Sequence, residues 1–170
     1  MLSYAMRSFA FAAAGVAALA AAVFASGANA GPPWGPGKPP FNLEVILRDV
    51  SGGKGFGHVK FRQPNDDTKI VFLNTWVRGL APNHSYLLQR AVDTTLDGNC
   101  TSTAWLTLGK GLVSQAITTD DRGTGRENLS RDLAAVPTGS RFDIHFRVID
   151  ATTSAPVLQS GCYRFTVKGH

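Results

Sequence analysis

Apolar and polar residues alternate with a period of two along most of the chain after Phe41, a period typical of β-strands that bury one face. The clearest example is the segment 141–150. Its apolar residues occupy every second position and polar residues fill the others: Phe142, Ile144, Phe146 and Val148 alternate with Asp143, His145 and Arg147. This pattern predicts a strand whose apolar side chains face the core.

Other segments show the same period or a short apolar run, and turn-forming Gly, Asp, Asn and Pro residues separate them. They cover residues 41–48, 57–62, 69–77, 86–92, 101–108, 116–119 and 163–167. The run 69–77 is apolar on both faces, which predicts a strand that is buried on both sides or covered by an arm. Residues 127–136 allow one short helix, because Leu129, Leu133 and Val136 have helical spacing. The pattern predicts an all-β domain over residues 41–170, with about 7–9 strands.

The segment 79–86 reads Gly-Leu-Ala-Pro-Asn-His-Ser-Tyr and precedes a predicted strand. Leu80, Pro82 and Tyr86 resemble the tyrosine corner of fibronectin type III and related immunoglobulin-like domains. In those domains a Leu-x-Pro turn leads to a tyrosine whose hydroxyl bonds back to the backbone. The resemblance implies an immunoglobulin-like Greek-key β-sandwich and carries no information about function.

Residues 1–30 have the composition of a secretory signal peptide. Arg7 is their only charged residue, an apolar run extends from Phe9 to Phe24, and small residues end at Ala28-Asn29-Ala30. The run has about 16 residues, fewer than the ~20 that span a bilayer comfortably. We expect cleavage after Ala30, secretion or export to the periplasm, and no stable membrane insertion afterwards. An uncleaved N-terminal anchor is the alternative.

Residues 31–40 contain five of the nine prolines, which exclude both a helix and a central strand. The segment is expected to be an extended, polyproline-like arm. We interpret it as a spacer between the cleavage site and the domain. The alternative is a docking peptide with Trp34 as its aromatic anchor.

The two cysteines, Cys100 and Cys162, are expected to form a disulfide, because cysteine pairs of exported proteins usually do so in oxidising compartments. The bridge would close a loop of about 63 residues and contribute roughly 4 kcal/mol on the chain-entropy account. A catalytic thiol is the sharper alternative, although the chain contains no Cys-x-x-Cys motif.

Charge is only mildly unbalanced, with 17 Lys and Arg against 12 Asp and Glu, and a net charge of +5. No run of like charges indicates a nucleic-acid-binding arm, so nucleic acid is not an expected partner. Several basic residues fall on or near the outer faces of predicted strands. If these were adjacent, they would form a patch for an acidic glycan, a phospholipid headgroup or another polyanion; otherwise they are separate solvated charges: Lys60, Arg62, Arg78, Arg90 and Arg147.

Three polar residues of the segment 141–150 are the best candidates for a catalytic site: Asp143, His145 and Arg147. A carboxylate at Asp143 could orient an imidazole at His145, but residues two apart on a strand lie nearly 7 Å apart. A polar, solvent-facing side of the strand therefore explains them. His58 opposite His145 would make a two-histidine metal site conceivable.

Acidic residues near Gly123 provide a second candidate, since hard oxygen ligands on a tight turn suit calcium. Asp120, Asp121 and Glu127 do not have the spacing of a calcium-binding loop, however, and Asp and Gly are also what a hairpin turn needs. A turn without metal is the simpler interpretation.

The sequence therefore favours a secreted or envelope-associated binding module without catalytic activity, catalytic residues, metal or cofactor. Its expected partner is an envelope or extracellular polyanion or protein. The alternative is a metal-binding or hydrolytic sandwich enzyme with a site around His145. The candidate ligand face has six members: His58, Lys60, Arg62, Asp143, His145 and Arg147.

Overall fold

The computed structural model describes residues 43–64 and 68–168, which form β-strands and no helix. The predicted signal peptide (residues 1–30) and arm (residues 31–40) lie outside the described residues. Eight strands have four residues or more and four have two, so the all-β prediction is confirmed. In chain order they are β1 (Leu43–Asp49), β2 (Phe56–Arg62), β3 (Ile70–Arg78), β4 (Ser85–Asp93), β5 (Leu106–Thr107), β6 (Gly109–Lys110), β7 (Val113–Ser114), β8 (Ile117–Thr118), β9 (Gly125–Asp132), β10 (Arg141–Asp150), β11 (Pro156–Ser160) and β12 (Tyr163–Thr166).

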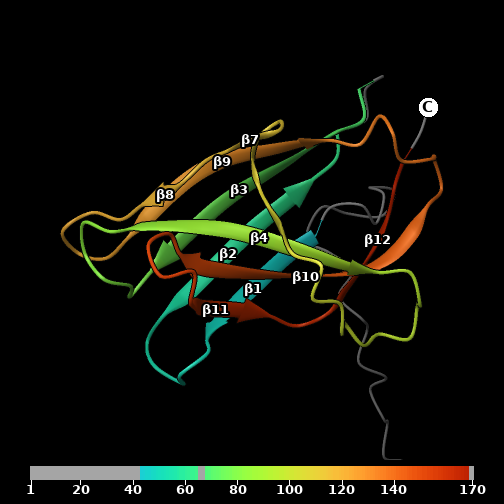
Figure 1. Ribbon diagram of the computed structural model, residues 1–170. Helices are drawn as coiled ribbons and strands as arrows, with labels where there is room; N and C mark the ends of the chain where they lie inside the picture. The colour runs from blue at the N-terminus through green and yellow to red at the C-terminus, as the bar shows by residue number, and fades with distance from the viewer. Residues whose placement is uncertain (1–42, 65–67, 169–170) are drawn as a thin grey trace, which may run out of the picture. The chain divides into compact units, whose positions relative to one another are not determined.

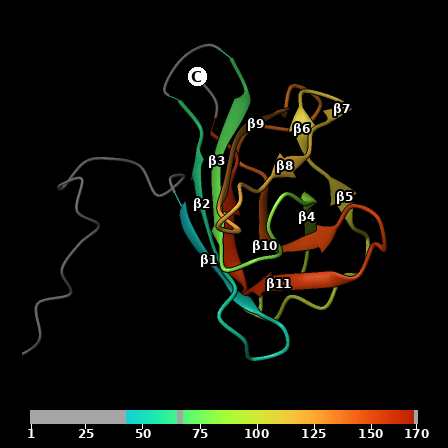
Figure 2. The same ribbon diagram turned by 90° about the vertical axis from the view of Figure 1, so that its left-hand side faces the viewer.

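The strands belong to one mainly antiparallel sheet that folds over into two facing layers (Figures 1 and 2). One layer has the order β1-β2-β3-β9, and the other contains β4, β10 and β12. Strand β11 pairs with both β10 and β1 and so joins the layers. On the opposite side β8 pairs with β4, β6 pairs with β9, and Thr119 forms a bridge with Gly125. The sheet therefore almost closes into a barrel.

The core lies between the layers, and the inward-facing alternate residues of each strand fill it. Phe61 of β2 packs edge-on against Phe165 and Phe146 of the other layer, with ring centroids 4.7 and 6.1 Å apart. Gln63 is also buried, and its amide group both donates to the Lys168 carbonyl (2.9 Å) and accepts from the Lys168 amide (3.0 Å). This pair of bonds joins the end of β2 to the segment after β12.

The run 69–77, expected to be buried on both sides, forms β3, which is buried on one face only: outward-facing Phe72 is 38% exposed. The structure also corrects two expectations for the conformation of individual segments. The short helix allowed over residues 127–136 is absent: β9 runs through Asp132 and pairs with β3, and Leu129 points into the core. Only Leu106–Thr107 of the predicted strand 101–108 is a strand; the residues before it form part of a loop. In both places long-range pairing, which the local pattern does not contain, decides the conformation.

The turn before β4 contains the hydrogen bond that the tyrosine-corner resemblance implies. The Ala81 amide donates to the Tyr86 hydroxyl at 3.0 Å, and the Tyr86 side chain is buried. Buried Thr119 fastens the same turn, because its hydroxyl donates to the Ala81 carbonyl (2.7 Å) and accepts from the His84 amide (3.0 Å). The corner thus anchors the start of β4 to the short strand β8.

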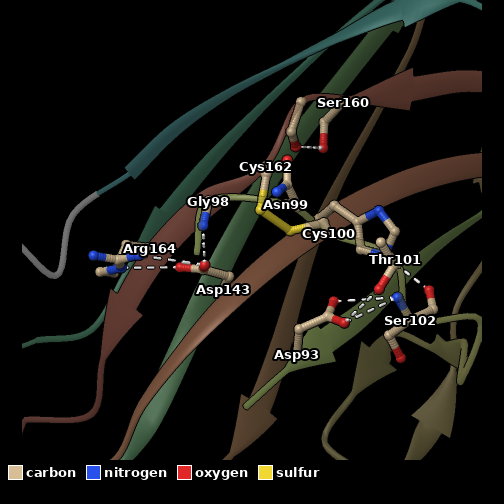
Figure 3. The surroundings of a disulfide bond; sticks show 12 residues. Asp93, Gly98, Asn99, Cys100, Thr101, Ser102, Asp143, Ser160, Cys162 and Arg164 are labelled. Atoms are coloured by element: carbon tan, nitrogen blue, oxygen red, sulfur yellow. Dashed lines mark hydrogen bonds and ion pairs between the residues drawn. A yellow bond between two sulfur atoms is a disulfide. The ribbon is translucent and has the colours of Figure 1, made fainter. Parts of the chain in front are cut away.

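A disulfide joins Cys100, in the loop 94–105 after β4, to Cys162, immediately before β12 (Figure 3). The two Cα atoms are 5.3 Å apart, and the predicted pairing is confirmed. Disulfides persist in oxidising compartments, so the bridge points to an environment outside the cytoplasm. The residues that the structure describes include no helix long and apolar enough to cross a membrane.

Replacement of Tyr86 by Phe tests the corner. The variant removes the acceptor of the Ala81 amide and should lower the free energy of unfolding by about 1 kcal/mol, measured by urea denaturation. Tyr163→Phe is a useful comparison, because the Tyr163 hydroxyl accepts from the Ile46 amide at the same 3.0 Å. An unchanged unfolding midpoint for Tyr86→Phe would show that the corner bond does not stabilise the fold.

Candidate functional site

Basic and aromatic side chains gather on the outer side of the β1-β2-β3-β9 layer. Even-numbered residues of these strands point outward, because odd-numbered residues such as Val45, Val59 and Leu73 fill the core. We name this surface the basic face and define it by nine residues, which include three of the six predicted ligand residues: Arg48, Phe56, His58, Lys60, Arg62, Phe72, Trp76, Arg78 and Arg126.

One row across the basic face places an aromatic ring between two arginines. Phe56 of β2 lies opposite Arg48 of β1 and opposite Arg78 of β3. The Cζ atoms of Arg48 and Arg78 lie 5.3 and 5.0 Å from the centroid of the Phe56 ring, within cation–π distance. The ring therefore contacts both guanidinium groups at the surface.

The next row continues this arrangement around Trp76. In the sheet register Trp76 lies between His58 of β2 and Arg126 of β9. Its ring is 5.8 Å from the Arg126 Cζ atom, 5.4 Å from the Arg78 Cζ atom and 5.9 Å from the Phe56 ring. The Trp76 Nε1 donor is covered and has no hydrogen-bond acceptor among the described residues. This row thus adds a third guanidinium group and an unsatisfied N–H donor.

The charge of the basic face is predominantly positive. The outward positions of the four strands carry five Lys and Arg residues against two carboxylates, Glu44 and Asp132. Glu44 lies 3.5 Å from the His58 imidazole. Four strands at about 4.8 Å spacing make the face roughly 14 Å wide. Such a surface can bind several anionic groups while it stacks on a planar ring.

The other three predicted residues lie on the outer side of β10, but two of them are not exposed. Asp143 and His145 are only 1% and 5% exposed, which corrects the expectation of a solvent-facing side. The reason is the loop 94–105, which crosses over this part of β10 and is held there by the disulfide (Figure 3). Strand β10 is therefore buried on both faces.

Asp143 is the polar anchor of this loop. Its carboxylate accepts from the Gly98 amide at 2.7 Å and from Arg164 Nε at 2.9 Å (Figure 3). Arg164 also donates to the Leu96 carbonyl at 2.8 Å. The bonds from Arg164 first, and then the bond from Gly98, hold the pKa of Asp143 below its usual value. The carboxylate is thus an ionised acceptor committed to the loop.

His145 and Arg147 make contacts of a different kind. His145 Nε2 donates to the Ser102 carbonyl at 3.1 Å, and its ring centroid lies 4.5 Å from that of Trp105. Arg147 Cζ lies 4.1 Å from the Trp105 centroid, and Arg147 Nε donates to Gln89 at 2.7 Å. These bonds fasten the end of the loop. Among the residues that the structure describes, no hydrogen bond joins His145 to Asp143.

The six predicted residues thus form two separate groups. Strands β11 and β1 lie between β10 and β2 in the sheet order, and β10 and β2 belong to different layers, so His145 and His58 lie on the outer sides of opposite layers and do not face each other. Residues 43–64 and 68–168 contain no group of three or more His, Cys, Asp and Glu side chains that could hold a metal ion. Asp120 caps a turn, since its carboxylate accepts from the Arg122 and Thr124 amides, both at 2.9 Å.

Five members of the basic face were not identified as site residues from the sequence, namely Arg48, Phe56, Phe72, Trp76 and Arg126. Their outward position follows from the period of two, but the rows follow only from the strand order and register. The other basic residues of the sequence-based list are distributed differently. Arg78 belongs to the basic face, whereas Arg147 lies beside Trp105 and Arg90 faces the interior.

No protein-family model matches this chain, and no curated protein matches it.

The Asp143 anchor predicts an acid sensitivity. Because its folded pKa lies below the ordinary value of 3.8, Asp143 contributes stability above that value and loses it as the pH falls through the folded pKa. Asp143→Asn should therefore unfold more easily at pH 6 and lose less stability than wild type between pH 6 and about pH 3. Asp121→Asn, at an exposed carboxylate, is the control and should keep the wild-type profile. Parallel profiles for wild type and Asp143→Asn would contradict the anchor.

Proposed function

We propose that this protein is an extracytoplasmic binding module, without catalytic activity, that holds an acidic polysaccharide on its basic face. Residues 1–30 would direct export and be removed, and the domain would act as a secreted or envelope-associated protein. The observation that carries the proposal is the placement of Phe56 between Arg48 and Arg78, beside Trp76 and Arg126.

The arrangement of arginines and rings suits this ligand class. Guanidinium groups bind carboxylate and sulfate through paired charge-assisted hydrogen bonds, and aromatic faces pack against the rings of a sugar chain. Because the side chains are already held by cation–π contacts, binding costs less conformational entropy. Repeated charges along a polymer match a face on which cations recur from strand to strand.

The covered face of β10 supports the choice of this surface. Asp143 and His145 are occupied by contacts with the loop 94–105, so their polar groups are committed within the fold. The cations of the basic face point away from the core, and the outward positions of the same four strands carry only two carboxylates, Glu44 and Asp132. The excess positive charge is therefore concentrated where a polyanion can approach.

Binding of a heparin fragment, used as a sulfated probe, tests the proposal. The wild-type affinity, measured by calorimetry at several salt concentrations, should fall as salt rises. The double variant Arg78→Gln/Arg126→Gln removes two cations from the basic face. It should bind at least about a hundredfold more weakly, since each charge-assisted bond contributes about 1.5–3 kcal/mol, a factor of ten or more for each arginine removed.

A control variant with the same change in net charge is Arg122→Gln/Arg141→Gln, which removes two exposed arginines outside the basic face. It should retain affinity within a factor of about three of wild type. An equal loss in both double variants would mean that only net charge matters. An affinity independent of salt would also contradict the proposal.

A further inference from the structure

A cavity lies between the two layers, at the end where β9 finishes and β10 begins. Its volume is about 150 Å³, and most of its lining is apolar. The rings of Phe61, Phe142, Phe146 and Phe165 contribute to this lining, together with Leu73. An apolar cavity of about 150 Å³ is large enough to hold one benzene ring.

Two arginines also line this cavity, one from each layer. Arg90 of β4 lies opposite core residue Phe146 in the sheet register, and Arg131 of β9 lies opposite core residue Val71. Both therefore occupy inward positions where strand alternation normally places apolar side chains. A charged group at such a position is costly unless an ion or hydrogen-bond partner compensates it.

Neither arginine has a carboxylate partner among the described residues. No ion pair there includes Arg90 or Arg131, and Arg131 Nη1 reaches only the Gly111 carbonyl, at a long 3.5 Å. Burial, and then the positive charge of Arg131, hold the pKa of Arg90 below its usual value. Two like charges thus lie beside one apolar cavity with no anion from the described chain between them.

We propose that this cavity binds a small amphiphilic carboxylate, with one ring or short branched chain among the phenylalanines and its carboxylate between Arg90 and Arg131. The carboxylate would supply the missing negative charge and accept hydrogen bonds from both guanidinium groups. The volume of the cavity suits one ring or one short branched chain, so the proposed ligand class is a monocarboxylate of about the size of phenylacetate. This site is separate from the basic face.

Three probes that share one ring test the charge requirement on the unaltered protein: phenylacetate, 2-phenylethanol and phenethylamine. NMR titration should detect phenylacetate binding at or below about 10 mM. The neutral alcohol should bind roughly tenfold to hundredfold more weakly, and the amine more weakly still, because each lacks the carboxylate. Equal affinity for the alcohol, or no phenylacetate binding in this range, would overturn the proposal.

Variants then locate the site. Arg90→Gln and Arg131→Gln should each weaken phenylacetate binding about tenfold and leave binding of the alcohol almost unchanged. Arg78→Gln/Arg126→Gln should leave phenylacetate affinity as in wild type, so a failure here is distinguishable from a failure of the polysaccharide proposal. Unchanged phenylacetate affinity in both single variants would overturn the assignment, and the comparison of probes stands even if a variant does not fold.

Discussion

The attachment of the loop 94–105 to β10 determines which polar surfaces the domain can present. The Cys100–Cys162 disulfide fixes the loop, and the Asp143 carboxylate then binds the Gly98 amide and Arg164 beneath it. A buried carboxylate is tolerated only with such partners, so the loop, the ion pair and the bridge support one another. Removal of the loop would leave the outer side of β10 with a polar surface and Trp105 without its contacts to His145 and Arg147.

Covering β10 leaves the two layers with different roles. The layer that contains β4 and β10 uses its outer polar residues for internal hydrogen bonds. The β1-β2-β3-β9 layer keeps its cations outward, arranged around Phe56 and Trp76. The same alternation that builds the core thus produces the basic face on its reverse side. Arg90 and Arg131 differ from the other cations of these strands because they point inward. Both line the cavity between the layers, which is therefore a second candidate site.

The period of two was sufficient to predict the all-β class, most long strands and the inward residues of β10. The expectation of export to an oxidising compartment was sufficient to predict the disulfide between the two cysteines. The sequence could not reveal that residues 94–105 cover β10, because the pairing of Asp143 with Gly98 and Arg164 depends on tertiary contacts. Nor could it place Arg48 beside Phe56, since neighbours across strands follow from register. For the same reason β9 looked partly helical until its pairing with β3 was known.

The attachment of the loop is tested most directly by hydroxyl-radical footprinting with mass spectrometry, before and after reduction of the disulfide. In the oxidised protein, His145 should be protected and Phe72, which is 38% exposed, should be labelled. After reduction, labelling of His145 and Trp105 should rise while core residue Phe146 stays protected. Labelling of His145 as fast as Phe72 in the oxidised protein would contradict the account, as would unchanged protection of His145 once the bridge is broken.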